Sequence, residues 1–188
     1  TALEPAFPLE GVIQAMEERV GFLPLGDFQH DPERDRTFEV AGHWALYCDN
    51  FLEGFHIPFV HPDLNAAVDY DQYTTVLFDH CNLQIAHARG QEDAFVLPEG
   101  HPEYGQDIAA FYFWVFPNLM FNFYPWGLSV NLVEPMAKDR SRVHFRSYVL
   151  DSAKLGQGAG GGLDQVAHED EAGVESVQQG IQSPASTT

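Results

Sequence analysis

Cysteine is scarce in this sequence. The 188 residues include two cysteines, Cys48 and Cys81. Neither stands in the short paired spacings that zinc or iron–sulfur sites need, and two are too few for a disulfide-rich scaffold. Sparse cysteine is typical of a reducing compartment, so we expect a cytoplasmic protein.

Basic residues are also few. Nine Lys and Arg stand against 28 Asp and Glu, which gives a net charge of −19. Nucleic acids and anionic membranes both need a positive patch, so we expect neither as a partner. The acidity fits a cationic substrate or a basic protein. We also find no signal peptide in residues 1–8 and no apolar run of membrane-spanning length.

The composition indicates a packed globular domain. Hydrophobic residues make up 45% of the chain and aromatic residues 13%, with 15 Phe and 7 Tyr. We expect one catalytic domain over residues 1–188, because this length supports a single core. The rings form either a bulky core or the lining of a cavity.

Periodicity predicts an α+β fold in which helices pack on an antiparallel sheet. Residues 1–9 read as a lead-in, and 90–108 as irregular structure. We predict helices over 11–20, 44–56 and 163–179, the last a long closing helix stopped by Gly180. Residues 62–71 are predicted as a loop that could act as a lid, and 156–162 as a flexible loop. Strands are predicted over 22–28, 36–41, 73–79, 83–89, 109–116, 119–124, 128–134 and 142–150.

The most informative stretch is Asn50–Pro62, which holds an amide, a carboxylate and two imidazoles. His56 and His61 are five residues apart, so on an unbroken helix they would point about 140° apart. Pro58 is expected to end the helix near His56, and Pro62 to keep His61 extended. We therefore expect one imidazole at a helix end and the other on the loop beyond it. The opposite helix face should be buried, through Trp44, Tyr47, Cys48, Phe51 and Phe55.

A carboxylate interrupts the apolar stripe of the closing helix. Asp170 shares this stripe with Val166, Val174, Val177 and Ile181. A buried carboxylate normally has a partner, although a half-exposed acid in a first turn would also suit the helix dipole. We expect the acids beside the stripe to face solvent: Glu169, Glu171 and Glu175.

Two imidazoles and one carboxylate on a single face are the ligand set of non-haem Fe(II) oxygenases. His56, His61 and Asp170 could form it if the closing helix packs against the helix over 44–56. A zinc-dependent hydrolase could use the same ligands with Glu53 as its base. The residues alone leave both alternatives open.

Three motifs add a family resemblance. Trp44 followed by Asp49–Pro62 is similar to the iron-site motif of Rieske non-haem iron oxygenase α subunits. Residues 113–127 resemble the aromatic strand pair of the branch that contains choline and carnitine monooxygenases. Glu169 and Asp170, with the helix up to Ser183, match the closing helix of that branch. The motifs occur in the family's order and extend from Trp44 to Ser183.

The resemblance implies a helix-grip (START/Bet v 1-like) fold that holds Fe(II) through His56, His61 and Asp170. Glu53 would link a histidine ligand to a neighbouring subunit's Rieske cluster, and Asn50 would lie close to the metal as a further catalytic residue. The substrate would be a small aromatic or quaternary-ammonium compound, hydroxylated or demethylated with O2. The implied substrate-binding residues lie on the aromatic strands: Phe113, Asn118, Phe121, Asn122 and Trp126.

The chain also departs from the family pattern. A Rieske [2Fe–2S] centre needs two Cys and two His in short paired spacings, which Cys48 and Cys81 do not supply. We therefore expect the cluster to come from a domain before Thr1 or from a partner, with a reductase as electron donor and a homotrimer as the assembly. A redox-inactive ligand-binding module on the same scaffold is the alternative from another class.

Overall fold

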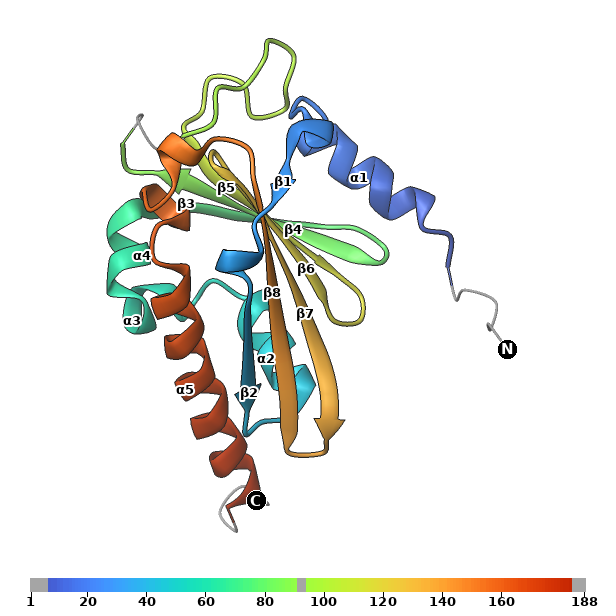
Figure 1. Ribbon diagram of the computed structural model, residues 1–188, viewed down its shortest axis with the longest axis vertical. Helices are drawn as coiled ribbons and strands as arrows, with labels where there is room; N and C mark the ends of the chain where they lie inside the picture. Colours follow the sequence, from blue (N-terminus) through green and yellow to red (C-terminus); the bar gives the residue numbers. More distant parts are fainter. Residues whose placement is uncertain (1–6, 91–93, 184–188) are drawn as a thin grey trace.

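The computed structural model describes residues 7–90 and 94–183, so lead-in residues 1–6 and irregular residues 91–93 lie outside the described residues. One antiparallel sheet of eight strands forms the centre (Figure 1). Its order is β1-β8-β7-β6-β5-β4-β3, and β2 also pairs with β8. The strands are β1 Gln29–His30, β2 Arg36–Val40, β3 Val68–Leu77, β4 Cys81–Ala88, β5 Ile108–Val115, β6 Leu119–Tyr124, β7 Gly127–Ala137 and β8 Arg140–Val149.

Helices cover both faces of this sheet, and the α+β prediction is confirmed. The long closing helix is present as α5. Among the described residues, none of the helices has the length and apolar character needed to cross a bilayer. The α-helices are α1 Glu10–Val20, α2 Trp44–Leu52, α3 Ile57–Val60, α4 Pro62–Ala67 and α5 Leu163–Gln182, and short 3-10 turns are η1 Leu25–Asp27, η2 Pro32–Arg34, η4 Ser152–Lys154 and η5 Gly158–Gly160.

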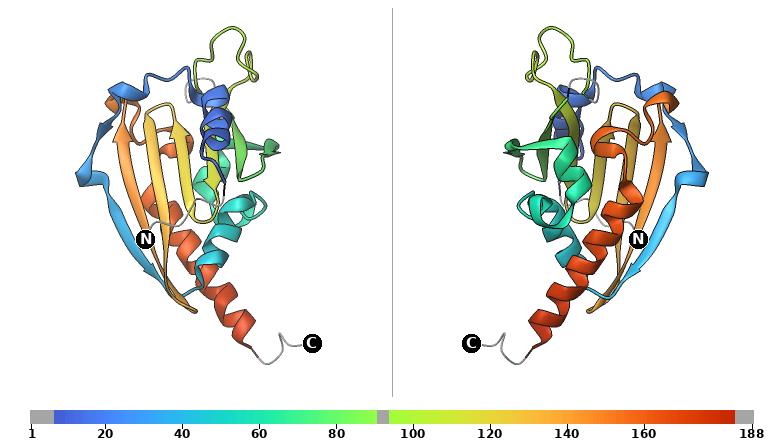
Figure 2. Two further views of the ribbon diagram at one scale, coloured as in Figure 1. Left: turned by 90° about the vertical axis from the view of Figure 1, so that its right-hand side faces the viewer. Right: turned by 90° about the vertical axis from the view of Figure 1, so that its left-hand side faces the viewer.

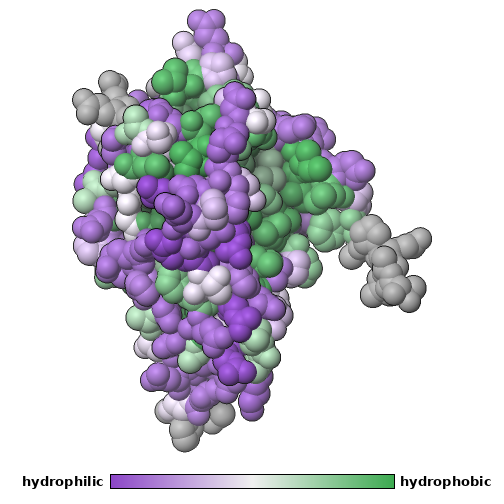
Figure 3. All heavy atoms as spheres, viewed as in Figure 1, coloured by the Kyte–Doolittle hydropathy of each residue, from purple (hydrophilic) through white to green (hydrophobic). Residues whose placement is uncertain are grey.

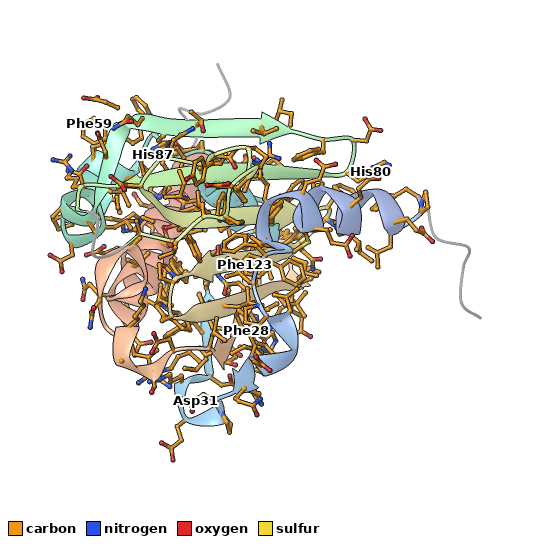
Figure 4. The ribbon with its side chains drawn as sticks, turned by 90° about the horizontal axis from the view of Figure 1, so that it is seen from above. Phe28, Asp31, Phe59, His80, His87 and Phe123 are labelled. Carbon is orange, nitrogen blue, oxygen red and sulfur yellow. The ribbon has the colours of Figure 1, made fainter. Side chains whose placement is uncertain are left out.

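Alternation along the strands divides the core into two layers. Phe111, Phe113 and Phe123 are buried on the face covered by α1, and Figure 4 shows Phe123 in the interior beneath that helix. Successive strand residues point to opposite faces, so Tyr112 points to the other side. That side carries α2 and α5. Figure 2 shows α1 in front of the sheet in one view and α5 in front in the opposite view.

The layer between the sheet and helices α2 and α5 positions the site. Tyr47 and Cys48 of α2 pack with Val174 of α5 and Met120 of the sheet. A Cβ on Gly42 would lie 2.8 Å from Cγ1 of Val174, so the approach of α5 depends on glycine there. Burial raises the pKa of the Cys48 thiol to about 11, which keeps it protonated at neutral pH.

The helix prediction over 44–56 is wrong at its end. α2 stops at Leu52, and Glu53 has extended backbone (φ −121°, ψ 138°). Pro58 does not end this helix; it occupies the first turn of α3, where its missing N–H costs nothing. As a result, Phe55 is 70% exposed instead of buried. Residues 62–71 are also not a loop, because α4 leads directly into β3.

Other predicted boundaries also need correction. Residues 22–28 form no strand, because the turn η1 occupies their second half. Residues 156–162 contain the turn η5, in which Ala159 and Gly160 are buried. Gly180 lies inside α5, which continues to Gln182. Val177 and Ile181 are each 52% exposed, whereas Gln178 is 8% exposed, so the predicted apolar stripe is not the buried face at the C-terminal end of α5.

Candidate metal centre

Three segments bring His56, His61 and Asp170 together. His56 directly precedes α3, His61 separates α3 from α4, and Asp170 lies in the second turn of α5. One donor atom from each side chain lies within 4.8 Å of the other two. His61 is 1% exposed, so burial fixes its ring tightly.

The two imidazoles present the same ring nitrogen to Asp170. His61 Nε2 lies 3.0 Å from Asp170 Oδ1, and His56 Nε2 lies 3.6 Å from the same oxygen. The opposite nitrogens face carboxylates: His61 Nδ1 is 2.7 Å from Glu169, and His56 Nδ1 is 2.7 Å from Glu53. Each Nδ1–H can donate to its carboxylate, which leaves both Nε2 lone pairs free for a metal.

The negative charge around the two imidazoles also supports a metal site. Three carboxylates, Glu53, Glu169 and Asp170, contact two imidazoles in a confined space. Asn50 Nδ2 donates to Asp170 Oδ1 at 2.6 Å and holds that carboxylate in place. A divalent cation would offset this concentration of negative charge. The donor types, their number and their convergence all fit a metal with two nitrogen ligands and one oxygen ligand.

Glu169 corrects the expectation that it faces solvent. Its Oε2 contacts His61, and Gln165 Nε2 donates to its Oε1 at 2.7 Å. The stripe pattern missed it because His61 approaches α5 from the flank of the helix. Burial tends to raise the pKa of Glu169, but hydrogen bonds from Gln165 and His61 outweigh burial and lower it.

Hydrogen bonds also outweigh burial in setting the pKa of His61. Burial alone would lower its pKa, but hydrogen bonds to Asp170 and Glu169 outweigh burial and raise it above the ordinary value. In the metal-free chain, a proton on His61 is therefore stabilised by the same carboxylates that surround the candidate metal position.

A cavity of about 90 Å³ adjoins these side chains. Burial raises the pKa of four lining tyrosines, so their phenols remain neutral at neutral pH: Tyr47, Tyr73, Tyr112 and Tyr124. Two more rings, Phe51 and Phe145, complete the aromatic wall. Uncharged polar groups also line the cavity: Gln84, Asn122, Ser129 and Asn131.

The five residues predicted for the pocket wall lie in different surroundings. Asn122 lines the cavity, but Phe113 and Phe121 lie on the face of the sheet covered by α1. Asn118 lies in the β5–β6 turn and donates to the Val133 carbonyl at 2.6 Å. Trp126 packs behind Tyr124, with ring centroids 5.4 Å apart, and lines a different cleft.

The missed wall residues follow from strand pairing. Tyr112 and Ser129 are the direct neighbours of Asn122 across the sheet. They share its face, because paired residues on adjacent strands point the same way. The family resemblance had implied the two phenylalanines, but the alternation places them on the other face.

Comparison with known families agrees with this geometry. A family model described as the ring-hydroxylating α subunit (catalytic domain) matches residues 29–188, which include all three converging side chains. The chain belongs to this ring-hydroxylating α-subunit family. The resemblance inferred from the motifs is thereby confirmed.

Curated relatives of this ring-hydroxylating domain include two kinds of monooxygenase. The chloroplastic choline monooxygenase of Arabidopsis thaliana is 32% identical over 157 residues, covering 80% of this chain and 35% of the relative. The carnitine monooxygenase oxygenase subunit of Escherichia coli K12 is 30% identical over 89 residues, or 47% of this chain and 22% of the relative. The chain thus spans about a third or less of these relatives.

Solved structures show the same fold. The quaternary ammonium Rieske monooxygenase CntA bound to an inhibitor superposes with a TM-score of 0.72 at 19% identity, covering 97% of this chain and 48% of that chain. CntA bound to L-carnitine gives a TM-score of 0.68 at 18% identity, covering 98% of this chain and 48% of that chain. At these identities the ring-hydroxylating domain shares their architecture, and its chemistry must be argued from its own side chains.

Proposed function

We propose that this chain is the catalytic domain of a Rieske-type non-haem iron oxygenase that uses O2 to hydroxylate or demethylate a small quaternary-ammonium compound. The observation that carries the proposal is the convergence of His56 Nε2 and His61 Nε2 on Asp170. Family membership supports iron over zinc for this donor set. We also assign the sheet and its closing helix to the helix-grip class.

Ferrous iron bound by His56, His61 and Asp170 would supply dioxygen activation, because three protein ligands leave coordination positions open. The chain's own groups prepare that site. Glu53 and Glu169 accept the Nδ1 protons and so fix both rings with Nε2 facing inward. Asn50 orients the Asp170 carboxylate, and the buried rings of α2 and the sheet exclude bulk water.

The cavity supports a cationic substrate. Neutral aromatic rings bind quaternary ammonium groups by cation–π contact, and Tyr73, Tyr112 and Tyr124 offer such rings. None of the lining residues, all within the described part of the chain, is lysine or arginine. We therefore propose a compact ammonium alcohol, hydrogen-bonded by Asn122 or Asn131, over a carboxylate-bearing analogue that would lack a cationic partner.

Electrons would enter beside Glu53. This acid contacts His56 and is 46% exposed. Phe55 and Phe59 are 70% and 76% exposed, with ring centroids 5.6 Å apart, and Figure 4 shows Phe59 at the periphery of the molecule. Exposed aromatic pairs favour protein contact. We propose that a Rieske [2Fe–2S] domain outside residues 1–188 docks here, supplied by a reductase, within a cytoplasmic homotrimer.

A peroxide-driven assay tests the function without the electron partners. Hydrogen peroxide supplies both the oxygen atom and its reducing equivalents, so the Fe(II)-loaded chain should convert an ammonium alcohol and release water. With O2 alone and no cluster protein, we expect no multiple turnover. His61→Ala should abolish product, whereas His168→Ala, which changes a 61% exposed side chain on α5, should not.

Other outcomes would favour the rival functions. Zinc binding with hydrolysis of an ester or amide would indicate a hydrolase that uses Glu53 as its base. Tight ligand binding without metal would indicate a redox-inactive binding module. Product from a carboxylate-bearing ammonium compound but not from the alcohol would retain the oxygenase and overturn only the proposed selectivity.

A further inference from the structure

A buried amide lies in the layer between the sheet and helix α2. Gln84 of β4 is 1% exposed and lines the cavity beside the candidate metal centre. Hydrophilic residues cover much of the molecular face in Figure 3, whereas Gln84 is a polar residue in the interior. Burying an amide is unfavourable unless its ends find hydrogen-bond partners, so the partners of Gln84 indicate its role.

Gln84 is hydrogen-bonded at both ends of its amide, to two different elements. Its Nε2 donates to the carbonyl of Phe51 at 2.6 Å, and its Oε1 accepts from the hydroxyl of Tyr73 at 2.9 Å. Phe51 lies in the last turn of α2, where carbonyl groups have no partner within the helix. The residue after the helix, Glu53, has extended backbone and does not continue it. Gln84 therefore caps the C-terminal end of α2 from the sheet.

The capped end of α2 carries two residues that hold candidate metal ligands. Asn50 directly precedes the capped residue and donates to Asp170 at 2.6 Å. Glu53 follows the capped residue by two positions and lies 2.7 Å from Nδ1 of His56. Any displacement of this helix end would move both residues together. The hydrogen bond that Gln84 donates therefore reaches the ligands through the backbone of α2.

Tyr73 holds the same segment from a second direction. Its ring lies against Gly54, where a Cβ would come within 2.7 Å of Tyr73 Cε1. The ring is also stacked on that of Tyr70, with centroids 6.0 Å apart. Because the Tyr73 hydroxyl donates to Gln84, one amide fixes both the end of α2 and the ring that packs on the residue after Glu53.

We propose that Gln84 is a positioning residue of the candidate metal centre, an assignment that rests on the proposed function. By fixing the end of α2, it keeps Asn50 and Glu53 in contact with two of the three candidate ligands, whose donor atoms then stay close enough for one metal ion. An aliphatic side chain at position 84 would leave the Phe51 carbonyl unpaired in the interior, and the helix end would shift to hydrate it. The metal centre would then lose its geometry while the fold remained.

Gln84→Met tests the assignment, because methionine is similar in length and forms neither hydrogen bond. Titration with Co(II), whose visible absorption reports ligand geometry, should show affinity about tenfold weaker than in the parent and a changed spectrum. Gln178→Met is the matched control, since Gln178 is also a buried amide and accepts from the backbone N–H of His43 at the opposite end of α2. Both variants should unfold at lower urea concentrations than the parent, but Gln178→Met should keep the parent's Co(II) affinity and spectrum.

A milder variant keeps the proposal falsifiable. Tyr73→Phe retains the ring against Gly54 and frees only one end of the Gln84 amide, so it should fold and lose about threefold in Co(II) affinity. If Gln84→Met does not fold, a parent-like affinity and spectrum in Tyr73→Phe would overturn the assignment. If both glutamine variants fold, equal affinities for Co(II) would show that Gln84 only supports the fold. A parent chain that binds no Co(II) would instead contradict the proposed metal centre itself, and this assignment with it.

Discussion

At the scale of single residues, the site depends on hydrogen bonds to the ring nitrogens that face away from Asp170. A histidine ligand binds through one nitrogen, and the partner of the other nitrogen sets the tautomer and the ring orientation. Glu53 and Glu169 provide those partners at 2.7 Å each. Neither acid needs to touch the metal to control it.

Glu169→Gln tests this role directly. The amide cannot accept the Nδ1 proton as strongly, so we expect affinity for Fe(II) or Co(II) to fall about 10- to 100-fold. Glu171→Gln is the control, since Glu171 pairs with His168, whose side chain is 61% exposed, and contacts neither His56 nor His61 in the hydrogen bonds of the described residues. Metal affinity by spectroscopic titration is the readout. Equal affinities in the two variants would mean that Glu169 is only a surface partner of Gln165.

The raised pKa of His61 predicts the pH dependence of metal binding. A metal must displace the proton from Nε2, and the metal-free pKa lies above its ordinary value of 6.5. Affinity should therefore be constant at alkaline pH and begin to fall before pH drops to 6.5, then by about tenfold per unit. A titration series should show this onset. If metal affinity begins to fall only at a pH well below the ordinary pKa of histidine, the hydrogen-bonded arrangement of His61 is contradicted.

Residue types and spacing were enough to predict His56, His61 and Asp170 as candidates that could converge. The same reasoning could not find Glu169, because its partner comes from a loop more than 100 positions away. The family resemblance implied Phe113 and Phe121 as residues of the pocket wall, but they lie on the opposite face of the sheet. Which residues face a cavity depends on the parity of each strand, and aromatic content carries no information about parity.

At the scale of elements, the site exists because α5 crosses α2 closely. Glycine at position 42 permits that approach, since a Cβ there would lie 2.8 Å from Val174. Val174 stands one turn after Asp170 on the same helix. Any displacement of α5 at this contact would therefore move Asp170 relative to the histidines.

Gly42→Ala should destabilise the fold by about 1–3 kcal/mol, the usual cost of overpacking a core. Gly173→Ala is the matched control, because a Cβ there meets nothing within 4 Å. Removing glycine from a helix interior should stabilise by roughly 0.5–1 kcal/mol. Urea unfolding of the two variants compares these effects. A Gly42→Ala protein as stable as the parent would show that α5 can accommodate a methyl group at position 42.

Seven of the eight predicted strands are present and residues 22–28 form none, but the ends of the helices were predicted less well. Pro58 was taken as a helix terminator, whereas the chain leaves α2 earlier at Leu52 and uses the proline to begin α3. Gly180 was taken as a stop, whereas α5 passes through it. Proline and glycine can each lie inside a helix at particular positions. Tertiary packing decides whether such a residue ends the helix or is part of it.

At the scale of the whole molecule, the two faces of the sheet have different roles. One face builds a core with α1, and the other supports the candidate metal centre and the cavity. Glu53 contacts His56, and the exposed rings of Phe55 and Phe59 belong to the same segment, where we propose that the electron donor docks. The charge of −19 suits a cationic substrate and a basic partner.

Anomalous diffraction from crystals of the Fe(II)-loaded chain, collected at the iron absorption edge, tests the central claim most directly. We expect one peak per chain, bonded to Nε2 of His56, Nε2 of His61 and the Asp170 carboxylate, with Glu53 and Glu169 still on the opposite ring nitrogens. A peak elsewhere, or an iron atom bonded through Nδ1, would contradict the account.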